Sequence, residues 1–166
     1  SYNTALGYQA GYSNTTGEVT AFGNVAGYNN TTGSITAIGQ VALYNNTTGV
    51  ANVAVGGRAS GVSDAAMLSN STGSYNTAVG TSALLSNTTA SYNTAVGYQA
   101  GYSNTTGTHQ TFLGYEAGRL ATGGDNTALG FRAGGSTTTG QYNTAVGSDA
   151  LLSNTTASSN TAVGYK

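Results

Sequence analysis

Short stretches that alternate polar and apolar residues recur along the whole chain, and each ends in a glycine. The clearest form is Asn-Thr-Ala-Val-Gly, at 76–80, 93–97 and 143–147. Such alternation with a β-branched residue favours a β-strand, because successive side chains of a strand point to opposite sides. Between the stretches stand segments such as NTTG at 14–17 and 104–107. These are typical of turns, since Asn tolerates left-handed backbone and Gly adopts it without steric cost.

The stretches form an internal repeat. Aligned on the motif glycine, the chain contains ten copies, spaced by 16 or 17 residues except for one spacing of 24. The ten glycines are Gly7, Gly23, Gly39, Gly56, Gly80, Gly97, Gly114, Gly130, Gly147 and Gly164. This period is too short for helix-pair repeats. Each copy is therefore predicted to be one coil of a parallel β-solenoid, with two short strands and two turns per coil.

One repeat domain is predicted over residues 1–166. The chain starts without Met and stops part-way through a repeat, so we expect it to be a fragment of a longer fibre. The single long spacing is explained by an insertion within 57–66 that loops out of one coil.

Alanine dominates two columns of the aligned copies, two residues before the glycine and three residues after it. Because tight turns enclose a narrow interior, small side chains are what such a lumen can hold. Ala59, next to the insertion, is assigned to the second column. The alanines predicted to fill the lumen are Ala5, Ala10, Ala78, Ala83, Ala95, Ala100, Ala145 and Ala150.

The residue immediately before the glycine is large and apolar in every copy. If the alanines face inward, this column points outward beside a Thr column. So continuous an apolar ladder is unusual on a soluble monomer, and identical chains around a common axis would cover it. We therefore expect a homotrimer; the opposite polarity, with the large residues inside, would suit a monomer. The residues predicted to face the trimer axis are Leu6, Ile38, Val55, Val79, Val96, Leu113, Leu129, Val146 and Val163.

The repeat motif resembles N-S-V-A-I-G, the head repeat of trimeric autotransporter adhesins, most closely in Val-Ala-Val-Gly at 53–56. NTAVGYQAG at 93–101 is similar to repeats of phage tail fibres and bacterial surface fibres that precede a C-terminal intramolecular chaperone. The resemblance covers nearly the whole chain and implies a left-handed parallel β-roll with three chains per head. The chain departs from it in its slightly longer repeat, its Tyr columns and its NTTG turns.

Composition excludes several functions. There is no cysteine, and four Lys and Arg against five Asp and Glu form no basic patch for nucleic acid. No apolar run approaches the ~20 residues needed to span a bilayer, so we expect no membrane insertion in this segment. The only histidine, His109, stands where other copies have Tyr, without a carboxylate pair nearby. We therefore expect no enzyme activity, no catalytic residue, no cofactor and no metal.

Two repeated features are candidates for ligand binding. Tyrosines could stack on sugar rings, and the candidate glycan contacts are Tyr8, Tyr12, Tyr98 and Tyr102. The Thr column resembles the hydroxyl arrays of ice-binding solenoids. Structural explanations are favoured for both, namely ring stacking along the solenoid and Thr ladders between coils.

The function expected is that of a structural or adhesive segment of a trimeric surface or tail fibre, which spaces or presents a receptor-binding tip. Its location would be extracellular, on a cell surface or a virion. Its partners would be two further copies and a glycan or protein receptor on a host or prey surface. The alternative is a ligand-binding solenoid, with glycan bound by the Tyr columns or ice bound by the Thr column.

Charged residues gather in the column two residues after the glycine, which contains Arg58, Glu116, Arg132 and Asp149. The last three belong to consecutive copies. If each copy is one coil, Arg132 is predicted to lie between the two carboxylates at the parallel-strand spacing of about 4.8 Å.

Overall fold

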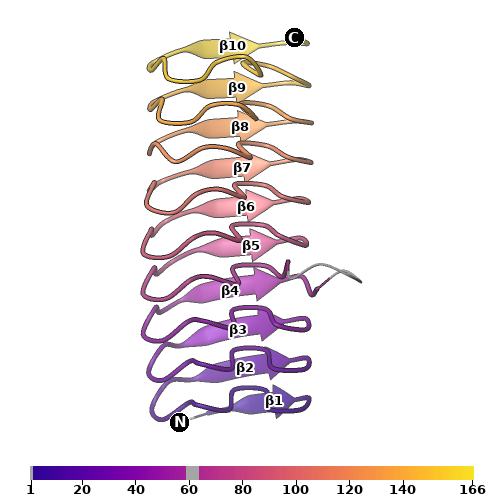
Figure 1. Cartoon of the computed structure of the whole chain (residues 1–166), viewed down its shortest axis with the longest axis vertical. Helices are drawn as coiled ribbons and strands as arrows, with labels where there is room; N and C mark the ends of the chain where they lie inside the picture. Colours follow the sequence, from indigo (N-terminus) through magenta and orange to yellow (C-terminus); the bar gives the residue numbers. More distant parts are fainter. Residues whose placement is uncertain (1, 59–63) are drawn as a thin grey trace.

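The computed structural model describes residues 2–58 and 64–166, which form an all-β parallel solenoid (Figure 1). Ten strands stack in chain order into one sheet, and the described residues contain no helix, hence none that could cross a membrane. The predicted solenoid class is therefore confirmed. The strands are β1 (Thr4–Leu6), β2 (Val19–Phe22), β3 (Ile35–Ile38), β4 (Asn52–Val55), β5 (Thr77–Val79), β6 (Thr94–Val96), β7 (Thr111–Leu113), β8 (Thr127–Leu129), β9 (Thr144–Val146) and β10 (Thr161–Val163).

The register of the sheet follows the sequence repeat. Between β5 and β6, Thr77 pairs with Thr94, and the following Ala and Val residues pair in the same way. The pairings between the other neighbouring strands also align motif with motif, from β1–β2 to β9–β10. Each copy is therefore one coil, as predicted.

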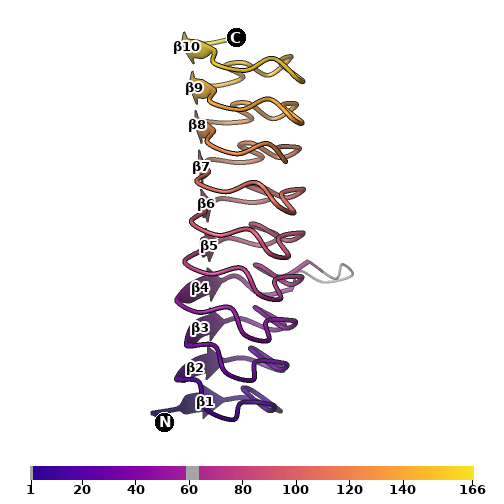
Figure 2. The same ribbon diagram turned by 90° about the vertical axis from the view of Figure 1, so that its left-hand side faces the viewer.

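The prediction of two strands per coil is wrong. Within the described residues each coil contains one strand, and the remainder runs through turns that Figure 2 shows on the opposite flank. Two positions after the glycine the backbone is left-handed even without Gly, with φ of 63° at Ser82 and 53° at Gln99. A β-strand requires negative φ, so residues with left-handed φ interrupt it. The turns nevertheless bond coil to coil, as where Leu84 N donates to Ala100 O at 3.0 Å.

The alanine columns lie in the interior. Six of the eight alanines assigned to the lumen, Ala78, Ala83, Ala95, Ala100, Ala145 and Ala150, are buried. Ala10 is half-buried and Ala5, in the first coil, is exposed. Within the long spacing the column is continued by Ala66, whose carbonyl accepts from Leu43 N. Ala59 lies outside the described residues, as does the 59–63 part of the insertion predicted within 57–66.

Larger side chains fill the space that the alanines leave. Leu43 and Leu84 stand four residues after the glycine, and Met67 takes the same place after the insertion; all three are buried with left-handed φ near 50°. Where Gly27 stands at that position, a large residue from a strand, Ile35, is buried against it instead. A large side chain therefore fills the interior either from the turn or from the strand, and the interior stays closely packed.

Buried asparagines form two ladders, one in the turns from Asn30 to Asn104 and one before the strands, where Val19, Ile35 and Gln110 interrupt it. In the turn ladder each Asn bonds the next, as Asn46 Nδ2 does to Asn30 Oδ1 and Asn70 Nδ2 does to Asn46 Oδ1, both at 2.7 Å. The second ladder precedes the strands, where Asn93 N donates to Asn76 Oδ1 at 3.0 Å. These bonds satisfy polar groups inside the fold, where an unpaired group would be costly. The turn Asn was expected only as a turn former, and its buried ladder was not predicted.

The narrow interior predicts a clear response to overpacking. Replacing Ala95, which is fully buried between β5 and β7, by Leu should lower the free energy of unfolding by about 1–3 kcal/mol or more. Ser103→Leu is the matched control, because the next coil already has Leu120 at the equivalent half-buried turn position. Urea unfolding monitored by circular dichroism measures both changes. Equal tolerance of Leu at the two sites would contradict this packing.

Candidate functional site

The outer face of the strands carries two uncharged columns, Thr and the large apolar residues. Of the nine residues predicted to face a trimer axis, Leu6, Ile38, Leu113 and Val163 are exposed, and the other five are half-buried. Phe22 belongs to the same column and is exposed as well. In the interior coil of β7, Leu113 is 50% exposed although its neighbours are in place. The apolar column thus faces outward over all ten coils.

The aromatic side chains stack along the solenoid. Tyr12, Tyr28 and Tyr44 form one stack, with ring centroids 5.1–5.2 Å apart. Tyr98, Tyr115 and Phe131 form another at 5.3 Å. Of the four candidate glycan contacts, Tyr12 and Tyr98 therefore each have one ring face against a neighbouring ring. Tyr8 is exposed, and Tyr102 is half-buried.

His109 belongs to a third aromatic stack. Its ring lies 5.2 Å from that of Tyr92, which in turn stacks on Tyr75. Its Nδ1 is 3.8 Å from Asp125 Oδ1 at the surface. Among the residues that the structure describes, no group of three His, Cys, Asp or Glu side chains could hold a metal ion.

The predicted charge column exists, and an ion pair links two of its coils. Backbone bonds from Arg132 N to Tyr115 O and from Asp149 N to Phe131 O place the charges in consecutive coils. Arg132 Nε lies 3.4 Å from Asp149 Oδ1, an ion pair without a well-aligned hydrogen bond. Glu116 is instead 3.9 Å from Arg119 of its own coil. A hydrogen bond to the Glu116 carboxylate, and then its charge, raise the pKa of Tyr115 above its ordinary value.

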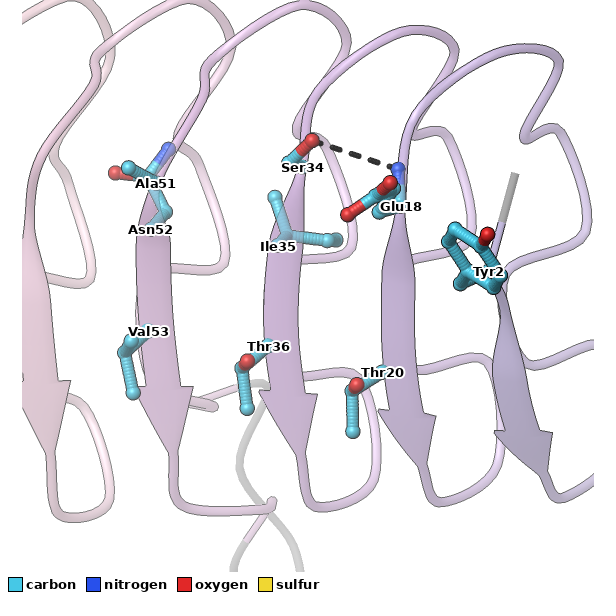
Figure 3. Close-up of a pocket in the computed structure, with 9 residues that line it drawn as sticks. All are labelled: Tyr2, Glu18, Thr20, Ser34, Ile35, Thr36, Ala51, Asn52 and Val53. Atoms are coloured by element: carbon cyan, nitrogen blue, oxygen red, sulfur yellow. Dashed lines mark hydrogen bonds between the residues drawn. The ribbon is translucent and has the colours of Figure 1, made fainter.

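A recess of about 420 Å³ opens at the amino ends of β1–β4, and sequence reasoning missed it (Figure 3). It combines an aromatic ring, a carboxylate, hydroxyl groups and apolar side chains. The lining residues are Tyr2, Glu18, Thr20, Ser34, Ile35, Thr36, Ala51, Asn52 and Val53. The signal that could have revealed it is that two consecutive copies of the repeat are one residue shorter and lack the Tyr that precedes the strand in longer copies.

No family model, no curated protein and no solved structure matches the chain. Its function has to be inferred from its own surfaces.

Proposed function

We propose that the chain is a structural or adhesive segment of a trimeric fibre on a cell surface or virion, outside the cell, where it spaces or presents a receptor-binding tip. Three chains would wind as left-handed β-rolls around a common axis, as in the adhesin and fibre repeats that the motif resembles. The observation that carries this proposal is the outward apolar column, which continues over all ten coils.

The dimensions of this column suit contact with its own copies. Ten coils at the parallel-strand spacing of about 4.8 Å give a stripe roughly 43 Å long. A stripe of this kind is rarely left in water. Identical chains carry the same stripe with the same spacing, so parallel association around an axis brings each coil against its own counterparts.

The stacking of coils suits a spacer. Each strand pairs only with its immediate neighbours in the stack. In such quasi-one-dimensional folds the length grows with the number of repeats while the local contacts stay the same. A rod of adjustable length is what a fibre needs to hold a tip away from its anchor.

The two alternatives receive less support from the same surfaces. Ice binding calls for a uniform face, whereas the Thr column is interrupted by Val53 and the adjoining column varies from Val79 to Phe22. Glycan binding by Tyr12 or Tyr98 would compete with ring faces that already stack on neighbouring tyrosines.

Sedimentation equilibrium tests the trimer. The protein should sediment as three chains of 16.4 kDa, and Val96→Asp should dissociate it because three carboxylates would meet near the axis. Thr106→Asp adds the same charge at an exposed position of the NTTG turn and should leave the trimer intact. Circular dichroism checks that both variants stay folded. A wild-type monomer at micromolar concentration would overturn the proposal.

A further inference from the structure

The recess at β1–β4 originates in two shortened repeats. Longer copies place Ser-Tyr-Asn before the strand, as at 74–76, and Tyr75 protrudes with a left-handed φ of 58°. In the copies of β2 and β3 one residue is missing, and Glu18 and Ser34 stand directly before the buried Val19 and Ile35.

Hydrogen bonds show that the position missing from these two copies is the one that Tyr75 occupies in the longer copies. Glu18 N contacts Ser34 Oγ at 3.5 Å, and Val50 N donates to Ser74 Oγ at 3.0 Å. Glu18 and Ser34 therefore occupy the column of Ser74, one residue before the tyrosine, and nothing in their coils replaces Tyr75. In the next coil the equivalent residue is Ala51, whose side chain is only a methyl group. The aromatic column is thus open for three coils.

The ring of Tyr2 bounds this opening at one end (Figure 3). Where neighbours are present, rings of the column stack almost parallel, as Tyr75 and Tyr92 do with an interplanar angle of 1°. Tyr2 has Glu18, Ser34 and Ala51 in the three coils that follow it, so its ring has no aromatic partner there. An apolar ring face is therefore left for a ligand.

The other walls supply polar groups in a defined arrangement. The carboxylate of Glu18, just before β2, and the hydroxyls of Thr20 in β2 and Thr36 in β3 lie on the same side as Tyr2. Val53, half-buried in β4, adds apolar surface. A sugar ring has the complementary chemistry, with C–H faces that stack on aromatic rings and hydroxyl groups that bond to carboxylates and hydroxyls.

We propose that this recess is a binding site for a neutral oligosaccharide. Its volume of about 420 Å³ lies within the usual range for ligand sites, ~300–1,000 Å³. Tyr2 and Tyr75 lie four coils apart, a distance of roughly 19 Å at the parallel-strand spacing. This distance is longer than one sugar ring, so the opening suits an oligosaccharide. Glu18 is the one formally charged residue of the lining, so the recess disfavours acidic sugars. The site goes beyond the structural role and lies at the amino ends of the strands, away from the apolar column at their carboxyl ends.

Calorimetric titration of the whole 166-residue protein tests the site, with cellohexaose, mannohexaose and a β-galactan hexamer as neutral probes. At least one should bind with a dissociation constant of about 1 mM or tighter, and hexagalacturonate should bind at least tenfold more weakly. Tyr2→Ala should weaken binding at least tenfold. Glu18→Gln should reduce the difference in dissociation constant between the neutral probes and hexagalacturonate. Tyr142→Ala is the control and should bind as wild type, because Tyr142 is an exposed tyrosine of the same column whose neighbours Asp125 and Ser159 keep the backbone of the longer repeat.

A second variant fills the recess without disturbing the fold. Ala51 has a φ of 54°, close to the 58° of Tyr75, so Ala51→Tyr can place its ring on Tyr75 as the longer repeats do. Binding should be abolished while the melting temperature stays the same or rises. If none of the neutral probes binds, or if Tyr2→Ala and Ala51→Tyr bind as wild type, the proposal is wrong.

Discussion

Gly97→Ala is expected to unfold the solenoid or to destabilise it by more than about 3 kcal/mol. Gly97 has a φ of 134°, a region that costs a residue with a side chain about 1–3 kcal/mol. A Cβ there would also stand 2.7 Å from the carbonyl carbon of Gly114 in the next coil, closer than real contacts allow. The clash is with backbone, so no side chain can move to relieve it. Thermal and urea unfolding measure the effect.

Gly164→Ala separates the two causes. Gly164 has nearly the same φ, 136°, but no atom lies within 4 Å of its added Cβ. Only the backbone strain remains, so this variant should lose no more than about 1–3 kcal/mol. A Gly97→Ala protein as stable as Gly164→Ala would show that the coils do not need this close approach.

The parallel register could be predicted because the repeat itself encodes it. The same short motif recurs in every copy, so stacking copy on copy aligns Thr with Thr and Ala with Ala. The alternation of Thr-Ala-Val also gave the inward and outward sides of the strand correctly. Both features depend on side-chain type and spacing, which the sequence states directly.

The second half of each coil could not be predicted in the same way. Its path depends on left-handed φ angles at residues such as Val41 and Gln99, which are not glycine. Nothing in the identity of Val or Gln announces this conformation, and Val disfavours it. It is imposed by bonds to neighbouring coils, for example from Gln99 N to Thr81 O at 3.2 Å. Tertiary contacts therefore override local preference here.

The recess was missed because the copies were aligned on the glycine alone. That alignment puts Glu18 and Ser34 in the column of the tyrosines, five residues before the glycine. The hydrogen bonds show instead that they match Ser74. Whether a one-residue gap falls before or after a given position is decided by backbone pairing, which the sequence of a short turn does not reveal.

Substitutions at Phe112 test whether a residue of the strand and a residue of the turn fill the same space in the interior. It replaces alanine in β7 and is fully buried, with its ring between Gly101 and Gly118 of two consecutive coils. Phe112→Ala should therefore leave a cavity and lower the free energy of unfolding by about 3–5 kcal/mol. The coil of β5 shows the alternative filling, in which Ala78 of the strand is accompanied by Leu84 four residues after the glycine.

Gly118→Leu should restore stability to the Phe112→Ala protein. Gly118 has a φ of 58°, and Leu84 at the equivalent position adopts 49°, so the backbone accepts Leu there. Alone, Gly118→Leu should be severely destabilising, because the new side chain would occupy the place of the Phe112 ring. The double variant should recover most of the loss, which gives a coupling free energy at the upper end of the usual ~0.5–3 kcal/mol or beyond it. Urea unfolding of the four proteins completes the cycle. Additive losses in the free energy of unfolding would show that residues 112 and 118 do not share one space in the interior.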